Sequence, residues 1–338
     1  MRFQKLTDAG NTTAEIGASA SIAERADCLR NLGRLDEAAN AYEKAIRRYE
    51  NLNNIRGVAA GKAQLGTVRM LQGRYDDAIK IYNESRNTFE RLGEPGTVAI
   101  IWHQIGMVYR EAGQFELAEQ AYRRALAIRV QQKDQSGEAL DLLELGNLYD
   151  SMGRLEDAVT FQRQSADIYT ELKDMSHEGM VRSNVADTLI KLRRYDEARR
   201  ELVRAIECKE PYGHAAEPWK TWDILYDLEQ ATGNADSAKQ AREKAIEAYL
   251  AYRRAGGVSQ SPLGNIYVMA TQAIKQGNAS QLERELAQLS GTVDDPQDKK
   301  AISKLRAILS GDGDPSLAND PALHYGNAVE LMLLLESL

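Results

Sequence analysis

The sequence predicts an all-α fold built as a repeat array, and three observations lead to that prediction. A six-residue phrase, GRLDEA at residues 33–38, returns every 40 residues as GRYDDA, GQFELA and GRLEDA, and less closely as RRYDEA and GNADSA. Each copy lies between two stretches whose apolar residues have helical spacing. The 338 residues include only 7 prolines, and 43% of them are hydrophobic, so long helices and a true core are both expected.

Small residues recur at fixed places in every repeat. The last position of the phrase is alanine in all six copies: Ala38, Ala78, Ala118, Ala158, Ala198 and Ala238. The position seven residues later is always Ala or Ser, and the position twelve residues earlier is small in five copies, with Tyr226 as the exception. Small side chains let two helix axes approach closely. We therefore expect these positions at contacts between helices.

Within a repeat we expect two helices joined by a glycine turn. In the second repeat they run from 56 to 72 and from 76 to 92, with apolar residues at helical spacing in between. Gly73 ends the first helix, because glycine adopts the left-handed conformation at a helix C-terminus without steric cost. An acidic residue follows in every copy, as Asp76 does here, where it interacts well with the positive end of the second helix.

Both ends of the chain depart from the repeat. Residues 1–13 contain Phe3 and Leu6, the spacing that closes several second helices, so this segment is predicted to be either the tail of a preceding repeat in a longer protein or a short capping helix. After Arg254 a linker is expected, and residues 257–338 are predicted to form a helical cap on the last repeat. Four helices are expected there: 262–276, one capped by Ser280 with Glu283, one from Asp295-Pro296 to about Gly311, and one from Asp320-Pro321 through Leu335.

The repeat resembles the tetratricopeptide repeat. The third copy carries the pattern best, with Trp102, Ile105, Gly106, Tyr109, Gly113, Phe115, Ala118, Tyr122 and Ala125. The length of 40 residues, against the usual ~34, is similar to that of kinesin light chains and of many bacterial arrays. The tail GDGDPSLANDPAL resembles the ends of bacterial arrays attached to STAND-type signalling NTPases. The resemblance implies a right-handed α-α superhelix, a solenoid of six repeats over residues 14–256.

Charge and composition exclude several classes of protein. The formal net charge of -7 repels a phosphate backbone, so nucleic acid is not an expected partner. The chain has neither a run of ~18 apolar residues nor an apolar leader after Met1, so no membrane span or secretory signal is predicted. Cys28 and Cys208 are far apart and form no disulfide framework. We expect a cytoplasmic protein.

Motifs for catalysis, cofactors or metals are not convincing. GVAAGK at 57–62 is one residue short of a phosphate loop, and the DGD at 312–314 lacks the glutamate and glycine of a calcium loop. The four histidines have no metal-ligand spacing, and neither cysteine has a companion histidine in the sequence pattern. No enzyme activity, cofactor or metal is predicted.

The resemblance implies that first helices line a concave face that receives a peptide or a partner helix. Carried over by register, the partner-binding candidates are Thr67, Met70, His103, Met107, Arg110, Leu143, Asn147, Asp150, Asp187, Lys191, Asp223 and Asp227. One end of this face is apolar and the other is mixed but leans acidic, which favours a partner with basic groups. Relatives hold chaperone tails with a clamp of Lys, Arg and Asn, of which only Asn147 is present here. Its other positions are occupied by Ala23, Ala63, Leu143 and Ser183.

Three functional hypotheses follow. The first is a non-catalytic scaffold that binds a protein or peptide on the concave face. The second is the sensor region of a STAND-type signalling NTPase. The third, a regulator or enzyme on an α-solenoid, is disfavoured because only about 13 residues precede the first repeat. Trp219 and Trp222 flank Lys220 and are interpreted either as packing residues or as a binding platform.

Overall fold

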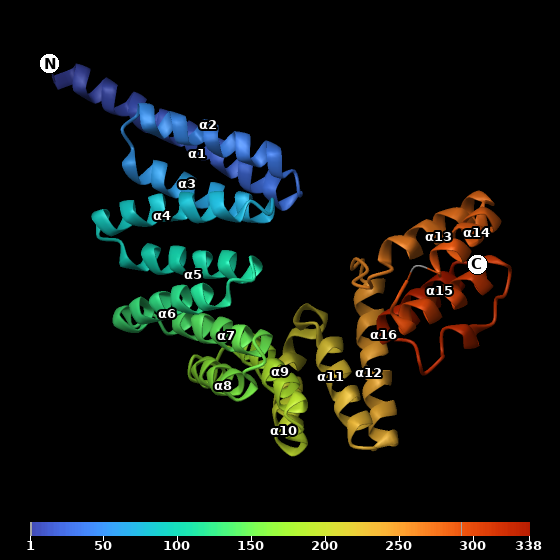
Figure 1. Cartoon of the computed structure of the whole chain (residues 1–338). Helices are drawn as coiled ribbons and strands as arrows, with labels where there is room; N and C mark the ends of the chain where they lie inside the picture. Colours follow the sequence, from blue (N-terminus) through green and yellow to red (C-terminus); the bar gives the residue numbers. More distant parts are fainter. Residues whose placement is uncertain (1, 292) are drawn as a thin grey trace. The chain divides into compact units, whose positions relative to one another are not determined.

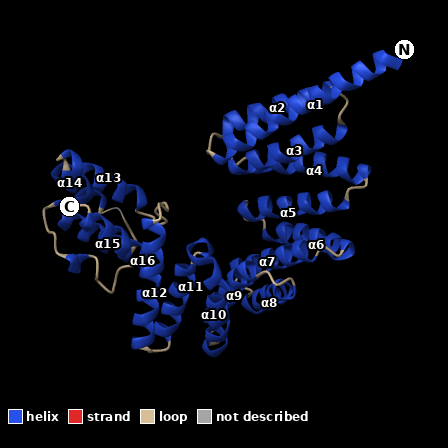
Figure 2. Ribbon diagram, turned by 180° about the vertical axis from the view of Figure 1, so that it is seen from behind, coloured by secondary structure: helices blue, strands red, loops and turns tan. Residues whose placement is uncertain are grey.

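The computed structural model describes residues 2–291 and 293–338, with side chains from Thr12 onward. All regular structure in these ranges is helical: sixteen α-helices, two 3-10 helices and no strand (Figure 2). Consecutive helices pack in pairs, as in a tetratricopeptide solenoid, so the predicted all-α repeat fold is confirmed. The chain divides into two compact parts, an N-terminal part ending at Asp174 and a C-terminal part beginning at Met175. No helix among the described residues is long and apolar enough to cross a bilayer.

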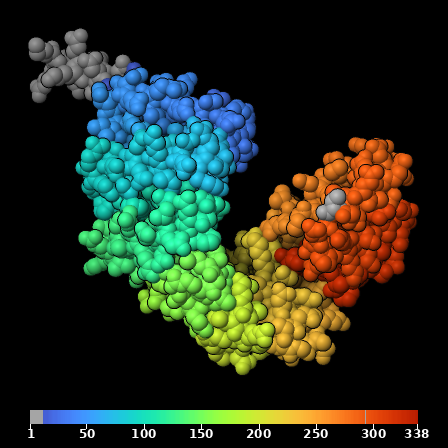
Figure 3. Space-filling model, in the orientation of Figure 1, coloured from blue at the N-terminus to red at the C-terminus, as the bar shows by residue number. Residues whose placement is uncertain are grey.

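The N-terminal part is a ladder of eight helices, each packed on the next (Figure 1). In chain order they are α1 (Arg2–Asn31), α2 (Leu35–Asn51), α3 (Ile55–Leu71), α4 (Tyr75–Leu92), α5 (Pro95–Glu111), α6 (Phe115–Gln132), α7 (Gln135–Ser151) and α8 (Leu155–Glu171). Side chains close the spaces between neighbouring helices in the space-filling view (Figure 3). The two helices predicted for the second repeat, 56–72 and 76–92, correspond to α3 and α4.

The C-terminal part continues the repeat and then leaves it. The helices are α9 (Met175–Lys191), α10 (Tyr195–Lys209), η1 (Glu210–Ala216), α11 (Pro218–Ala231), α12 (Ala235–Arg254), α13 (Gly264–Gln276), α14 (Ala279–Leu289), α15 (Pro296–Leu309), η2 (Pro315–Leu317) and α16 (Tyr325–Glu336). Leucines of α14, α15 and α16 form one apolar core. The apolar α16 also packs on α12, where Val329 joins Trp219 and Tyr249 in a second cluster.

The small residues lie where the periodicity placed them. All six alanines that close the repeated phrase are fully buried. Gly106 shows why its position must be small, because a Cβ atom there would lie 2.6 Å from the ring of Tyr122. The helices therefore approach closely enough that any added side-chain volume collides with the neighbouring helix.

The turn inside each repeat has a left-handed residue at one fixed place. Gly33, Gly73, Gly113, Gly153 and Gly233 all have φ between 71° and 76°. In the fifth repeat Arg193 replaces the glycine, and it adopts the same backbone conformation with φ of 58°. The turn geometry is thus dictated by the packing of the two helices and not by the presence of glycine alone.

The structure differs from the predicted helix starts at three places. Ser280 and Glu283 form no capping box: α14 begins after Asn278, and Glu283 pairs instead with Arg306 at 2.7 Å. Asp320 does not start the last helix, because its carboxylate accepts from the amide of Ala322 in a turn and α16 begins only after His324. The segment 1–13 is not a separate helix, since α1 runs without a break from Arg2; the side chains of Phe3 and Leu6 lie outside the described residues.

Ala118→Leu is expected to destabilise the N-terminal part by about 1–3 kcal/mol, because the added atoms overpack a contact that has no free volume. Ala127→Leu on the exposed face of the same helix is the matched control and should stay within about 0.5 kcal/mol of wild type. Urea unfolding followed by circular dichroism measures both. Equal stability of the two variants would contradict the assigned packing.

Candidate functional site

The partner-binding candidates of the N-terminal part lie on three first helices, α3, α5 and α7. Thr67 and Met70 are half-buried, and the Thr67 hydroxyl is 2.8 Å from the hydroxyl of Tyr82 on α4. Met70 and Met107 pack partly against the apolar clusters beneath them. Asn147 and Asp150 are also half-buried. These side chains offer a mixed surface of thioether, hydroxyl, amide and carboxylate groups.

Two candidates are buried. Leu143 is only 4% exposed and His103 only 7%. The Nδ1 atom of His103 lies 2.7 Å from Oδ1 of Asp141 on the neighbouring helix α7, and the imidazole meets the ring of Tyr122 edge-on. Both residues belong to the packing between helices, and they offer little surface to a partner.

Asp141 is a residue that our sequence interpretation missed. It is fully buried, and its Oδ2 atom has no hydrogen-bond partner, although Nε of Arg129 is 3.7 Å away. A signal was present: the same repeat position is Gly61, Ile101, Val181 and Thr221 in other copies, so a carboxylate there breaks an apolar or small pattern. A buried carboxylate of this kind costs free energy unless its neighbours compensate it.

Arg110 joins two first helices through an ion pair. Its guanidinium lies 2.5 Å from Glu144 on α7 and 3.3 Å from Glu111 on its own helix. The side chain of Arg110 is about a quarter exposed, so part of the ion pair reaches the surface. Arg110 is therefore held in one place before any partner arrives, which lowers the entropy cost of a new contact.

The candidates of the C-terminal part lie on α9 and α11, two helices in direct contact, and most of them are aspartates. Asp187 is exposed and pairs with Lys191 at 3.0 Å. Asp223 lies 3.4 Å from Nε2 of His324, which belongs to the segment before α16. That segment is held to α12 by Arg242, whose guanidinium donates to the backbone oxygens of Asp320 at 2.9 Å and Leu323 at 3.1 Å. The C-terminal segment therefore borders the acidic surface, which the sequence pattern did not indicate.

Asp227 has an unusual electrostatic environment. Although the residue as a whole is exposed, protein packed around its carboxyl raises the pKa of Asp227 to about 6. The carboxylates of Asp223 and Asp187 raise this pKa further, and His324 opposes them. Negative charge thus exceeds positive charge at this surface, which is the condition under which a cationic group is attracted.

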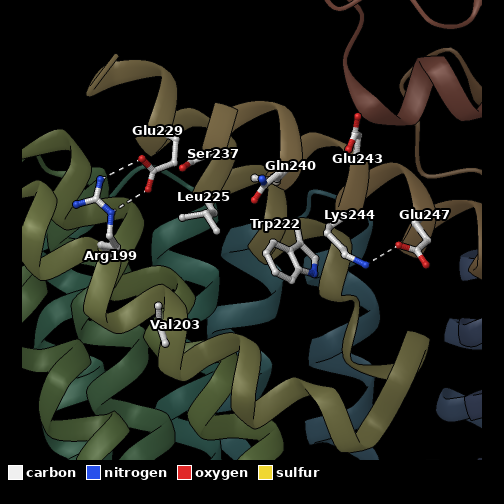
Figure 4. Close-up of a pocket in the computed structure, with 11 residues that line it drawn as sticks. Arg199, Val203, Trp222, Leu225, Glu229, Ser237, Gln240, Glu243, Lys244 and Glu247 are labelled. Carbon is white, nitrogen blue, oxygen red and sulfur yellow. Dashed lines mark hydrogen bonds and ion pairs between the residues drawn. The ribbon is translucent and has the colours of Figure 1, made fainter. Parts of the chain in front are cut away.

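The two tryptophans have different environments. Trp219 is fully buried, and its ring lies tilted against that of Tyr252 with centroids 4.8 Å apart. It is therefore a packing residue. Trp222 lines a groove of about 570 Å³ between α10, α11 and α12, together with Val203 and Leu225 (Figure 4). Ion pairs border the groove: Arg199 with Glu229 at 2.8 Å and Lys244 with Glu247 at 2.9 Å. No group of three or more potential metal ligands is found among the described residues.

Paired helices of constant length, stacked through small residues, define the class of helical repeat proteins. One family model of the tetratricopeptide repeat matches residues 57–131 and 97–171, and a second such model matches residues 24–88. Residues 24–171 therefore consist of tetratricopeptide repeats. Domains of this kind are generally protein-interaction folds. A comparison with curated proteins gives no match.

Solved structures agree with this fold. BtubC (BKLC) from P. vanneervenii is similar with a TM-score of 0.56 at 16% identity, over 72% of this chain and 92% of that one. A STAND protein with a tetratricopeptide repeat sensor from Pyrococcus horikoshii gives the same score and identity over 90% of this chain but only 46% of that one. PilF of Pseudomonas aeruginosa has a TM-score of 0.51 at 16% identity, over 70% of this chain and 94% of that one. Likeness at this identity establishes the fold.

Proposed function

We propose that the chain is a non-catalytic interaction module that binds a protein or peptide segment carrying basic groups. The fold is one that generally binds polypeptides. The observation that supports the charge preference is the set of charged groups where α9 and α11 meet: the carboxylates of Asp187, Asp223 and Asp227 outnumber the two basic partners, Lys191 and His324. Side chains on two packed helices form a surface that a peptide segment can follow.

A lysine or arginine of the partner would lie among Asp187, Asp223 and Asp227. Lys191 and His324 already compensate part of this negative charge, so one added cation is what the surface accommodates best. The contact is open to solvent, so it contributes little to affinity and more to the choice of partner and the rate of encounter.

The N-terminal part by itself would supply apolar anchors on its first helices α3 and α5. Met70 and Met107 are half-buried, with flexible thioether side chains that adapt to different partner surfaces. Arg110, already fixed by Glu144, adds one oriented donor. We propose that these groups contact the apolar portion of a bound segment.

Asp227→Asn is expected to weaken binding of a basic peptide by about 2- to 5-fold at neutral pH, the range for one solvent-exposed ion pair. Fluorescence anisotropy of a labelled peptide with alternating Leu and Lys measures this, beside a version with Glu in place of Lys. In the wild type, the Asp227 carboxylate keeps its charge above pH 6 and loses it as the pH falls through about 6. Binding should therefore weaken below that pH, and the variant should show a smaller pH dependence.

Asp236→Asn is the matched control, because Asp236 is an exposed aspartate on the second helix of the same repeat. It should leave affinity unchanged. Asp227→Asn removes a charge that its neighbours repel, so the variant is not expected to lose stability, and a loss of binding cannot then be attributed to unfolding. Equal binding of the Lys and Glu peptides would overturn the proposed charge preference.

A second candidate function is the sensor region of a STAND-type signalling protein. The observation that favours it is the fold likeness to the Pyrococcus horikoshii protein over 90% of this chain, which includes helices beyond the repeat. The coding sequence next to this chain tests it. An NTPase domain in frame or encoded alongside would support the candidate, and its absence from both places would reject it.

A further inference from the structure

The connection between α10 and α11 differs from the other turns between repeats. In its place the chain forms the 3-10 segment η1, followed by Pro218 as the first residue of α11. Gly213 interrupts η1 with φ of 52° and ψ of -137°, a backbone conformation that L side chains rarely adopt. The first helix of this repeat has only 14 residues, and residues of α10, η1 and α11 together line a cavity of about 240 Å³.

Lys209, the last residue of α10, places its amine at this cavity. The residue is only 6% exposed, and its Nζ atom donates to the Thr221 hydroxyl at 2.8 Å. Thr221 lies 3.0 Å from the hydroxyl of Ser183, which donates to the backbone oxygen of Gly179. The Thr221 hydroxyl must therefore donate to Ser183 and accept from Lys209. This series of hydrogen bonds uses one of the three hydrogens of the Lys209 ammonium group.

The ammonium group has no counter-ion in the described part of the chain. No carboxylate oxygen lies within 4.0 Å of Nζ. Glu217 attracts the charge from a distance but is itself bound to Lys220 at 2.6 Å and to the side chain of Gln260 at 2.8 Å. Glu210 lines the cavity and is exposed. A buried cation that lacks a partner is unfavourable, and an anion in the cavity would relieve that cost.

The remaining walls of the cavity are mainly apolar. Ile206, Pro218 and Trp222 line it beside the polar groups. Its volume is below the ~300–1,000 Å³ of pockets that hold drug-sized molecules, so it suits a small ligand. Burial lowers the pKa of Lys209 to about 8, with Lys220 contributing to the shift and Glu217 opposing it. The amine is nevertheless still mostly protonated at neutral pH.

We propose that this cavity binds a small carboxylate with an apolar body, whose carboxylate accepts the two remaining hydrogens of the Lys209 ammonium while the body lies against Ile206, Pro218 and Trp222. The same chemistry can come from a free short-chain carboxylate or from the C-terminal carboxylate of a peptide. None of Asp187, Asp223 and Asp227 lines this cavity, and the proposal does not depend on the function proposed above.

Isothermal titration calorimetry of the full chain with butyrate tests the site, with butyramide as the uncharged probe of the same shape. Butyrate should bind saturably at pH 7 and butyramide should not. The protonated fraction of an amine with pKa of about 8 falls about tenfold between pH 7 and pH 9, and affinity for butyrate should fall about tenfold with it. Equal binding of the two probes, or no binding of either, would overturn the proposal.

Lys209→Met keeps the length of the side chain and removes its charge, so butyrate binding should be lost. Lys220→Met is the matched control, because Lys220 is exposed, and it should retain binding. If Lys209→Met proves unfolded, Thr221→Val serves instead, since it removes the hydroxyl that orients the amine and should weaken binding. Retention of wild-type affinity in the folded variant would reject the site.

Two further arms refine the assignment. Glu210→Gln removes a negative charge from the cavity lining and should strengthen butyrate binding; a weakened affinity would contradict an anion site. The tripeptide Leu-Ala-Val with a free C-terminus is compared with its C-terminal amide. Binding of the free peptide above that of butyrate identifies a chain terminus as the source, and binding of butyrate alone identifies a free carboxylate.

Discussion

Trp219→Ala is expected to destabilise the C-terminal part by about 3–5 kcal/mol, the range for removal of a fully buried tryptophan. The indole packs against Tyr249 and Tyr252 of α12 and shares a cluster with Tyr325 and Val329 of α16. Its loss therefore leaves a cavity in the cluster that joins the last repeat to α16. Chemical denaturation followed by circular dichroism should show the change in the transition of residues 175–338.

Trp222→Ala is the matched control for this prediction. Trp222 lies three residues away on the same helix but is only half-buried, so its removal should cost clearly less than that of Trp219. Trp219→Phe adds a second comparison. Because Nε1 of Trp219 has no hydrogen-bond partner, phenylalanine loses area but no bond and should retain most of the stability. Equal losses for Trp219→Ala and Trp222→Ala would contradict the assigned packing.

Glu178→Gln is expected to cost about 3 kcal/mol at neutral pH, because it removes one partner of a buried charge network. Glu178 is 1% exposed and receives hydrogen bonds from Arg182 at 2.8 Å and from Arg204 at 2.9 Å. Burial alone would raise the pKa of Glu178, but the two guanidinium groups outweigh burial and lower it to about 2. Urea unfolding of wild type and variant measures the difference in the free energy of unfolding.

The pH dependence of this difference has a definite sign. A carboxylate whose folded pKa lies below its ordinary value of 4.5 stabilises the folded state above that value, and the contribution is lost as the pH falls through about 2. The gap between wild type and variant should therefore shrink below pH 4.5. Glu207→Gln is the control, since Glu207 is an exposed partner of Arg204 at 3.3 Å and should change stability by no more than about 0.5 kcal/mol. A constant gap down to pH 2 would exclude the proposed linkage.

The repeat was accessible from the sequence because it rests on local rules. Ala118 and Gly106 are small because two helix axes meet there, and Gly73 is left-handed because a helix ends there. Both requirements recur every 40 residues, so the small residues and the glycines are visible in the sequence as a repeat. The helix starts at Ser280 and Asp320 were wrong because a side chain that caps a helix equally well forms a turn or pairs elsewhere, as Glu283 does with Arg306.

The candidate site could be predicted from the sequence only in part. Register alone placed Asp187, Asp223 and Asp227 on first helices, but it also placed His103 and Leu143 there, and both proved buried. Register gives the helix and the approximate face, whereas exposure depends on how far the neighbouring helix reaches over that face. The contact of His324 with Asp223 joins residues about a hundred positions apart, and no period relates them.

By itself the sequence determined the helices, the turns and the small-residue contacts, because each depends on residues within one 40-residue interval. Only the tertiary structure decided which polar side chains are buried and which charged groups lie close to one another. Three environments show this: the cavity at Lys209, the burial of Asp141 between helices, and the surplus of negative charge at Asp227. Each is formed by residues from more than one helix. The physical reason is that burial and electrostatic environment are set by the whole surroundings of a group, and spacing along the chain records only its place on one helix.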